Sequence, residues 1–189
     1  FQFGEHGLID KRTMYEASIR VPMIVHCPDL IKNPGHRPEQ IVSIDIAPTF
    51  IEAAELPIPE GIQGDSFLKL ITGESNEWRE AFLYEYFWER SFPQTPTVLG
   101  VRTNDYKFMQ FHGIWDKYEL YDMKNDPHEM NNLIGDIEIE NRAGQLDGHI
   151  GSRAEEPIKS IYGKMRQHLM RLLEETGAAR EPNWLPLTP

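Results

Sequence analysis

The spacing of hydrophobic and polar positions changes along this 189-residue chain and divides it into three parts. In the first part, Ile19–His26 is a continuous apolar, β-branched run, which is typical of a buried strand inside a parallel sheet. Ser43–Ala54 has the spacing of a helix, and a second short helix is expected near Phe67–Ile71. We therefore expect a strand followed by two helices. Because a buried strand needs neighbours on both edges, we also expect more chain before Phe1.

In the second part, short aromatic and β-branched runs alternate with turn residues, which predicts a small antiparallel sheet. The runs are Phe82–Trp88, Val98–Arg102, Tyr106–Phe111 and Glu119–Tyr121. Asn104 and Asp105 lie between two of these runs and are typical of a hairpin turn. Asp126–Glu129 has an Asp, a Pro and a Glu in the order of an N-cap and first helical turn, so we expect a helix to begin there.

In the third part, residues 134–156 have no sustained period and contain several Gly, Asp and Asn residues, which predicts a surface loop. A helix is expected over 157–177, with Gly177 as its C-terminal cap. Its apolar residues share one face: they are Ile158, Ile161, Met165, Leu169 and Leu172.

Composition excludes some classes of partner. The formal net charge of -11 argues against a nucleic-acid partner, which requires a basic surface. A hydrophobic content of 40% is that of a folded protein. No apolar run reaches the roughly 18 residues of a membrane helix, so no membrane span is expected. Cys27 is the only cysteine, so the chain has no internal disulfide.

The first 22 residues carry the most specific pattern, and the pattern resembles the segment of type I sulfatases that follows their last calcium ligands. The matching pieces are Gly4-Glu5-His6-Gly7, Lys11, Tyr15-Glu16 and Arg20-Val21-Pro22. Further matches follow in the family's order: Asp45-Ile46-Ala47-Pro48-Thr49, Gly64-Asp65-Ser66, Arg102-Thr103 with Tyr106-Lys107, and Glu119-Leu120-Tyr121-Asp122 with Asp126-Pro127-His128-Glu129. Each piece is weak alone, but their order and spacing together are specific.

The resemblance implies an α/β fold: the C-terminal part of an alkaline-phosphatase-like α/β core, followed by a small α+β subdomain with an antiparallel sheet and a long C-terminal helix. Residues 1–75 would end the catalytic core. Residues 76–189 would form the subdomain, with the loop 134–156 and the helix 157–177.

The resemblance places the family's sulfate-binding lysine at Lys11. A sulfate ester gains negative charge on its oxygens as the S–O bond breaks, and a fixed ammonium stabilises that charge. Without the motif, Lys11 reads as a solvated surface lysine. His6 is a second catalytic candidate, because an imidazole between glycines can donate a hydrogen bond to the sulfate or leaving oxygen; a structural histidine is the alternative.

Glu16 and Arg20 also match family positions. They are four residues apart, and we expect them to form a structural ion pair beneath the active-site loop.

The resemblance also implies two cofactors, calcium and a formylglycine nucleophile made from a Cys or Ser. Cys27 does not fit the formylglycine motif Cys/Ser-x-Pro/Ala-x-Arg, because Asp29 stands at the Pro/Ala position and Ile31 at the Arg position. We expect the calcium ligands and the nucleophile upstream of Phe1, so this chain would hold no metal ligand and would be inactive by itself.

A substrate contact is expected in the segment Phe111–Trp115, where His112 and Trp115 flank a glycine. A ring stacked on a sugar and a histidine donating to a hydroxyl suit a glycan. The alternative is a packed hairpin end.

The resemblance thus predicts the C-terminal portion of a sulfatase that acts on a sulfated small molecule or glycan. Its expected partner is the N-terminal part of the same enzyme, and its expected location is periplasmic or secreted. Two other functions stay open: a phosphonate or phosphate monoester hydrolase of the same superfamily, and a truncated, non-catalytic module.

Overall fold

The computed structural model describes residues 1–112, 117–134, 139–140, 149–150 and 155–178. Its contacts group the chain into two compact units. Phe1–Arg20 belongs with the chain from Ala81 onward, and Val21–Glu80 forms the second unit. The predicted division of the family's domains at residue 75 stays a prediction.

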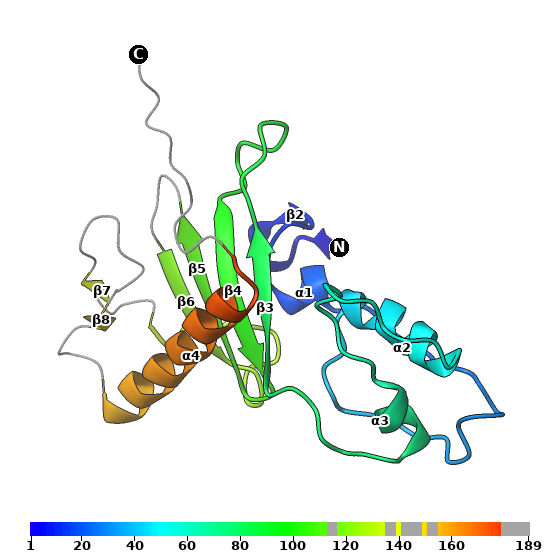
Figure 1. The fold of residues 1–189 in the computed structure, drawn as a ribbon. Helices are drawn as coiled ribbons and strands as arrows, with labels where there is room; N and C mark the ends of the chain where they lie inside the picture. The colour runs from blue at the N-terminus through cyan, green and yellow to red at the C-terminus, as the bar shows by residue number, and fades with distance from the viewer. Residues whose placement is uncertain (113–116, 135–138, 141–148, 151–154, 179–189) are drawn as a thin grey trace. The chain divides into compact units, whose positions relative to one another are not determined.

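A four-stranded antiparallel sheet is the framework of the first unit (Figure 1). Its strands follow the chain order: β3 (Ala81–Tyr86), β4 (Thr97–Thr103), β5 (Tyr106–His112) and β6 (Lys117–Asp122). The hairpin between β4 and β5 is closed by the Thr103 hydroxyl, which accepts a hydrogen bond from the Tyr106 amide at 3.0 Å. The predicted antiparallel sheet and the predicted hairpin turn are confirmed.

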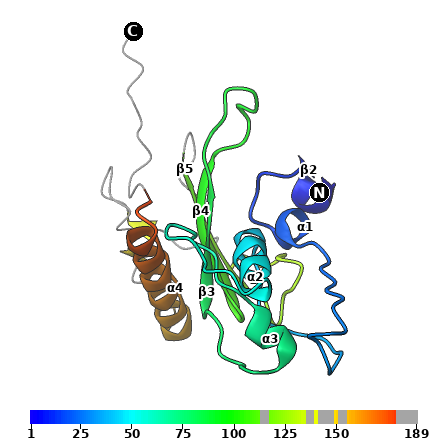
Figure 2. The ribbon, with the colours of Figure 1, turned by 45° about the vertical axis from the view of Figure 1, so that its right-hand side comes forward.

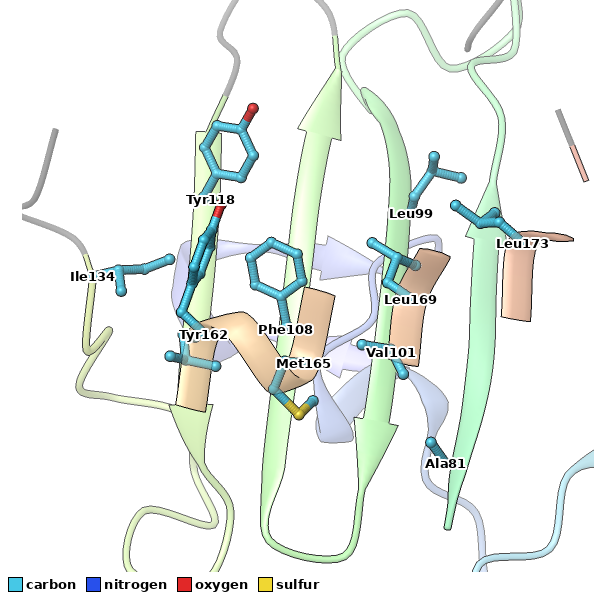
Figure 3. Close-up of a cluster of buried hydrophobic side chains, with 11 residues drawn as sticks. Ala81, Leu99, Val101, Phe108, Tyr118, Ile134, Tyr162, Met165, Leu169 and Leu173 are labelled. Carbon is cyan, nitrogen blue, oxygen red and sulfur yellow. The ribbon is translucent and has the colours of Figure 1, made fainter. Parts of the chain in front are cut away.

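One face of the sheet is covered by the long helix α4 (Glu156–Glu175), as Figures 1 and 2 show. The interface is an apolar core in which Phe108 and Tyr162 meet edge to face at 5.4 Å (Figure 3). The helix ends in a Schellman motif: the amide of Gly177, at φ 66°, donates to Glu174 and that of Ala178 donates to Leu173. The predicted helix and its glycine cap are confirmed.

The opposite face of the sheet is covered by the N-terminal segment (Figure 2). This segment consists of the paired strands β1 (Gln2–Phe3) and β2 (Ile9–Asp10), the 3-10 turn η1 (Glu5–Gly7) and the short helix α1 (Glu16–Ile19). Met14 is fully buried against β4, where Gly100 makes room for it: a Cβ at Gly100 would lie 2.3 Å from the Met14 sulfur. The sheet is therefore covered on both faces.

The second unit contains η2 (Ser43–Asp45), α2 (Ile46–Ala53) and α3 (Leu68–Thr72), so both helices predicted for this part are confirmed. Asp45 is fully buried and receives a bidentate pair from Arg79 at 2.6 and 2.8 Å. A Cβ at Gly64 would lie 2.1 Å from the Ile44 carbonyl oxygen, so the chain crosses η2 too closely for any side chain there.

The predicted strand Ile19–His26 is wrong. Residues 20–26 have no regular structure, and Ile24 is 92% exposed. A strand needs a neighbour for its backbone hydrogen bonds, and no strand among the described residues pairs with this run.

The helix predicted to begin at Asp126 is a turn instead. The Asp126 carboxylate accepts hydrogen bonds from the Met130 and Asn131 amides, and these bonds close the turn. Glu129 has a left-handed φ of 57°, which does not continue a right-handed helix.

The predicted loop 134–156 begins with Ile134, which is buried in the core rather than exposed. It also contains two paired strands, β7 (Ile139–Glu140) and β8 (His149–Ile150).

Candidate functional site

The candidate site is built on the N-terminal segment, whose backbone is strained. Five of its residues have positive φ angles: Gly4 at 126°, His6 at 55°, Gly7 at 69°, Asp10 at 90° and Arg12 at 91°. The two glycines adopt these angles at no steric cost, but each of the other three costs about 1–3 kcal/mol. Such strain persists only where surrounding contacts impose the conformation, and it concentrates at functional sites.

Two adjacent cations in this segment have different surroundings. Arg12 is held: its guanidinium pairs with Asp10, lies 3.9 Å from a Glu89 oxygen and stacks 3.3 Å above the Phe92 ring. Lys11 is exposed and makes no ion pair with the part of the chain that the structure describes. Lys11 is thus the cation of the two that is available to an anionic ligand.

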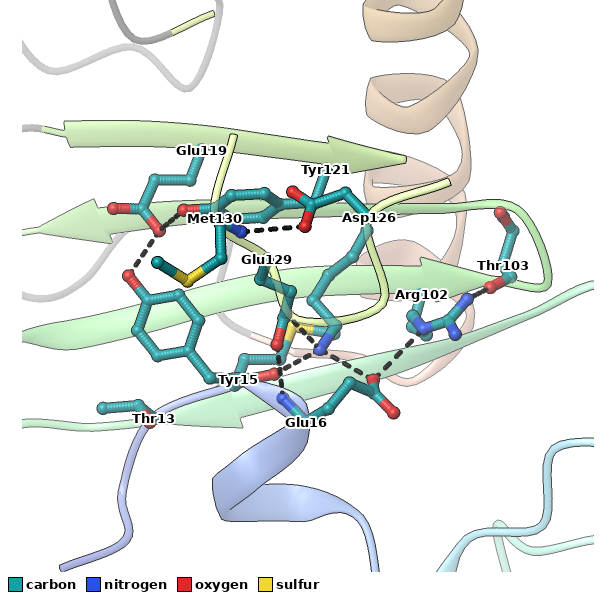
Figure 4. A network of polar contacts seen from close by, with 12 residues as sticks. Thr13, Tyr15, Glu16, Arg102, Thr103, Glu119, Tyr121, Asp126, Glu129 and Met130 are labelled. Atoms are coloured by element: carbon teal, nitrogen blue, oxygen red, sulfur yellow. Dashed lines mark hydrogen bonds and ion pairs between the residues drawn. The ribbon is translucent and has the colours of Figure 1, made fainter. Parts of the chain in front are cut away.

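A buried ion cluster holds the segment on the sheet (Figure 4). Lys107, on β5, is fully buried, and its ammonium donates to the Met14 carbonyl oxygen at 2.7 Å. The same ammonium lies 2.8 Å from a Glu16 oxygen and 2.7 Å from a Glu129 oxygen. The second Glu129 oxygen accepts the Glu16 amide at 2.7 Å. The backbone is therefore fixed immediately before and immediately after Tyr15.

The pKa values of the two carboxylates in this cluster are shifted in opposite directions. Burial opposes ionisation of Glu16, but Lys107 and Arg102 outweigh it and hold the pKa of Glu16 below its ordinary value. Burial raises the pKa of Glu129, although Lys107 acts against that rise. Glu16 is consequently the member whose negative charge the fold stabilises.

The side chain of Tyr15 is fixed as well. Its hydroxyl donates to Glu119 at 2.6 Å, and the Tyr121 hydroxyl donates to the same oxygen at 3.0 Å. Glu119 is 1% exposed, and burial together with its negative charge raises the pKa of both phenols. Both tyrosines are therefore neutral hydrogen-bond donors at ordinary pH.

His6 lies flat on the ring of Tyr15. The ring centroids are 3.9 Å apart and the ring planes are 10° from parallel. Since Tyr15 is fixed at its backbone and its hydroxyl, the imidazole rests on a rigid surface. The structure thus places both catalytic candidates, His6 and Lys11, on one strained segment fastened to the sheet.

The expected ion pair between Glu16 and Arg20 is wrong. Glu16 pairs with Lys107 and Arg102, and Arg20 is exposed. The α1 helix spans only one turn, and the sheet supplies buried cations that need a carboxylate.

Of the two predicted substrate contacts, the structure describes His112. His112 is 8% exposed at the end of β5. Alternation along the strand puts it on the same face as Phe108, which packs against α4, and on the face opposite Lys107. Trp115 lies outside the described residues. A role of either residue in substrate binding stays a prediction.

Sequence reasoning missed Lys107, Glu119 and Glu129 as supports of the site. A signal for the first was present: Lys107 stands between Tyr106 and Phe108 in a predicted strand, where a buried charge needs a buried partner. The identity of that partner, 22 residues away in sequence for Glu129, was not readable from spacing.

The described residues contain no group of three or more His, Cys, Asp or Glu side chains arranged to hold a metal ion. None of their helices is long and apolar enough to span a bilayer.

Comparison with known proteins places this geometry in a family. Residues 4–156 match the family model described as N-sulphoglucosamine sulphohydrolase, C-terminal. An N-acetylglucosamine-6-O-sulfatase of Bacteroides thetaiotaomicron is 36% identical over 182 residues, which cover 93% of this chain and 28% of that protein. An N-acetylglucosamine-6-sulfatase of Bos taurus is 29% identical over 176 residues, which cover 74% of this chain and 30% of that protein.

A solved structure of a protein in complex with its substrate, D-glucosamine-2-N,6-O-disulfate, superimposes with a TM-score of 0.64 and 34% sequence identity. The match covers 93% of this chain and 32% of the solved one. The chain therefore spans about a third or less of the length of these relatives.

Proposed function

The chain belongs to the N-sulphoglucosamine sulphohydrolase C-terminal family, and on that premise we propose that the intact protein is a sulfatase acting on a sulfated glycan. The observation that carries the proposal is the match, over 93% of the chain, to an N-acetylglucosamine-6-O-sulfatase. The substrate class that follows is a glucosamine residue with an O-sulfate ester. The neighbour bound to a disulfated glucosamine supports the same class.

The geometry of the N-terminal segment supports this chemistry. A sulfate group needs a cation that is free to meet it, on a backbone rigid enough to keep that cation in place. Lys11 meets the first condition, because it is exposed and makes no ion pair with the described residues. Arg12 beside it does not, because it is already paired with Asp10 and stacked on Phe92. The buried cluster around Lys107 meets the second. In this proposal Lys11 neutralises the sulfate oxygens, and His6 donates a hydrogen bond to the sulfate or to the leaving oxygen.

The family's cofactors are part of the proposal rather than of the described structure. A formylglycine supplies the nucleophile in such enzymes and calcium neutralises the sulfate. The described residues do not fit a calcium site, since no cluster of three metal-ligating side chains occurs among them. In this proposal both cofactors belong to parts of the intact protein outside the described residues, and this chain supplies Lys11 and His6.

Lys11→Ala in the intact protein tests the proposal. We expect kcat/KM on 6-O-sulfated glucosamine to fall by about 100-fold, the usual scale for the loss of one electrostatic stabiliser. The melting temperature should not change, because Lys11 is exposed. Lys124→Ala removes another exposed lysine, in the turn after β6, and serves as the matched control that keeps full activity.

Two results would overturn the proposal. If Lys11→Ala retains activity within twofold of the unsubstituted enzyme, Lys11 is not in the site. If the intact protein hydrolyses phosphate or phosphonate monoesters but no sulfate ester, it belongs to the other branch of hydrolases considered above.

A further inference from the structure

We propose that Tyr15 is a positioning residue for His6: its ring is the surface that sets the imidazole in its productive orientation. The inference rests on the proposed sulfatase activity and adds a residue and a role to it. Three observations carry it: the fixation of Tyr15, the strain at His6 and the near-parallel contact between the two rings.

Tyr15 is held by hydrogen bonds in addition to its packing against the sheet. Lys107 holds the carbonyl of the preceding residue, Glu129 holds the amide of the following residue, and Glu119 holds the hydroxyl. These contacts come from three separate places along the chain, two strands and the turn that holds Glu129. The tyrosine ring is only 7% exposed, so it has little room to reorient.

The backbone around His6 is held by hydrogen bonds within the turn, from the Gly7 amide to the Gly4 carbonyl oxygen and from the Leu8 amide to the Glu5 carbonyl oxygen, both at 3.0 Å, but these bonds do not orient the imidazole. His6 lies in a single 3-10 turn between two glycines, at a left-handed φ of 55°, and its side chain is only half-buried. A side chain that is half-buried needs a contact to fix its ring orientation. Among the described residues, that contact is the Tyr15 ring, 3.9 Å away between centroids and 10° from parallel.

A stack of two aromatic rings limits one degree of freedom above all, the tilt of the imidazole. Tilt decides where the ring nitrogens point, and a hydrogen bond weakens steeply once its angle departs from linear. The Tyr15 ring thus controls whether His6 donates to a substrate oxygen, without touching the substrate itself.

The experiment compares Tyr15→Phe with Tyr15→Leu in the intact protein. The first keeps the ring and removes only the hydroxyl; the second removes the ring as well. We expect the kcat of Tyr15→Phe to stay within about threefold of that of the unsubstituted enzyme. We expect Tyr15→Leu to lower kcat by about tenfold more, the fold-change that corresponds to losing one aromatic pair, with little change in KM.

The same two substitutions are then made in a His6→Ala background. If Tyr15 acts through His6, the kcat values of the Tyr15→Leu and Tyr15→Phe variants should then differ by less than about twofold. If the tenfold difference persists without His6, the ring acts on the fold or on Lys11, and the proposal is wrong. A ring-dependent loss confined to KM would contradict it as well.

Tyr162→Leu is the matched control for stability. It removes a tyrosine ring of similar burial from an edge-to-face pair with Phe108, on the face of the sheet that α4 covers. It should destabilise the protein and leave kcat at 25 °C unchanged. A loss of kcat matching that of Tyr15→Leu would show that destabilisation alone explains the effect.

A readout that does not depend on turnover separates this inference from the proposed function. In protein with 13C-labelled histidine, the ring current of Tyr15 should move the His6 carbon-bound protons upfield, and Tyr15→Leu should abolish the shift while Tyr15→Phe keeps it. Absence of that difference overturns the stack itself. If the stack is present but no sulfated sugar is hydrolysed, the proposed function fails and the role given to His6 fails with it.

Discussion

The two faces of the four-stranded sheet are covered in opposite ways. Toward α4 the contacts are apolar and aromatic, with Phe108, Leu120 and Leu169 all at most 2% exposed. Toward the N-terminal segment, an apolar patch around Met14 and Met109 adjoins buried charges, among them Lys107. Both faces exclude water, but the buried ion pairs around Lys107 lie on the second face, where their directional hydrogen bonds define positions.

The difference teaches what each kind of burial does. Apolar contacts are non-directional and tolerate shifts of the covering element. A buried ammonium with three oxygen partners within 2.8 Å does not, because each displaced partner leaves a buried polar or charged group without its hydrogen bond in a medium of low dielectric constant. The site candidates His6 and Lys11 stand on the face that has this directional anchoring.

Lys107→Met removes the central cation of the charged face and should lower the free energy of unfolding the most. Loss of the ammonium leaves Glu16 and Glu129 without their shared partner, and removing one member of a buried pair costs about 3–5 kcal/mol. We expect the loss in chemical denaturation of the intact protein and in faster hydrogen exchange of β5 amides.

The double variant Lys107→Met with Glu129→Gln separates charge from packing. Since it also removes one of the stranded charges, it should regain part of the lost stability. A double variant less stable than Lys107→Met alone would show that packing, rather than uncompensated charge, dominates there.

Leu169→Ala tests the apolar face. It opens a cavity beneath α4, where Leu169 is 2% exposed, and should lower the free energy of unfolding by about 2–5 kcal/mol. At a temperature where the variant is folded, we expect kcat/KM to be unchanged, because no directional contact of the N-terminal segment is lost. A clear fall in kcat/KM of the folded enzyme would mean that the two faces are coupled.

Glu16→Gln tests the charged face through the pH dependence of stability, and it should change the free energy of unfolding the least of these substitutions. The pKa of Glu16 is held below its ordinary 4.5, so the unfolded chain binds its proton at higher pH than the folded chain does. The stability contributed by the ionised carboxylate is therefore present above pH 4.5 and is lost as the pH falls through the lower, folded-state pKa.

We accordingly expect the stability difference between the unsubstituted protein and Glu16→Gln to shrink as the pH falls below 4.5. Denaturation of both proteins between neutral and acidic pH measures it. A difference that stays constant with pH would show that Glu16 has the same pKa in the folded and unfolded states.

Prediction from the sequence succeeded where structure follows from local pattern. The four strands, the hairpin at Asn104 and the helix ending before Gly177 all follow from spacing, turn chemistry and capping, which act over a few residues. It failed at Ile19–His26, because a strand exists only where another strand pairs with it. It failed at Asp126 because Glu129 turns inward to Lys107 instead of continuing a helix.

The sequence by itself determined the family, the order of the elements and Lys11 as the candidate for sulfate, since these depend on residue types at fixed spacing. Only the tertiary structure decided the partners of Glu16, the occupation of Arg12 and the ring on which His6 lies. The physical reason is that a buried charge takes its partner from whichever group the fold brings within about 3 Å. Here that group came from β5 and from the turn after β6, rather than from the same helix face.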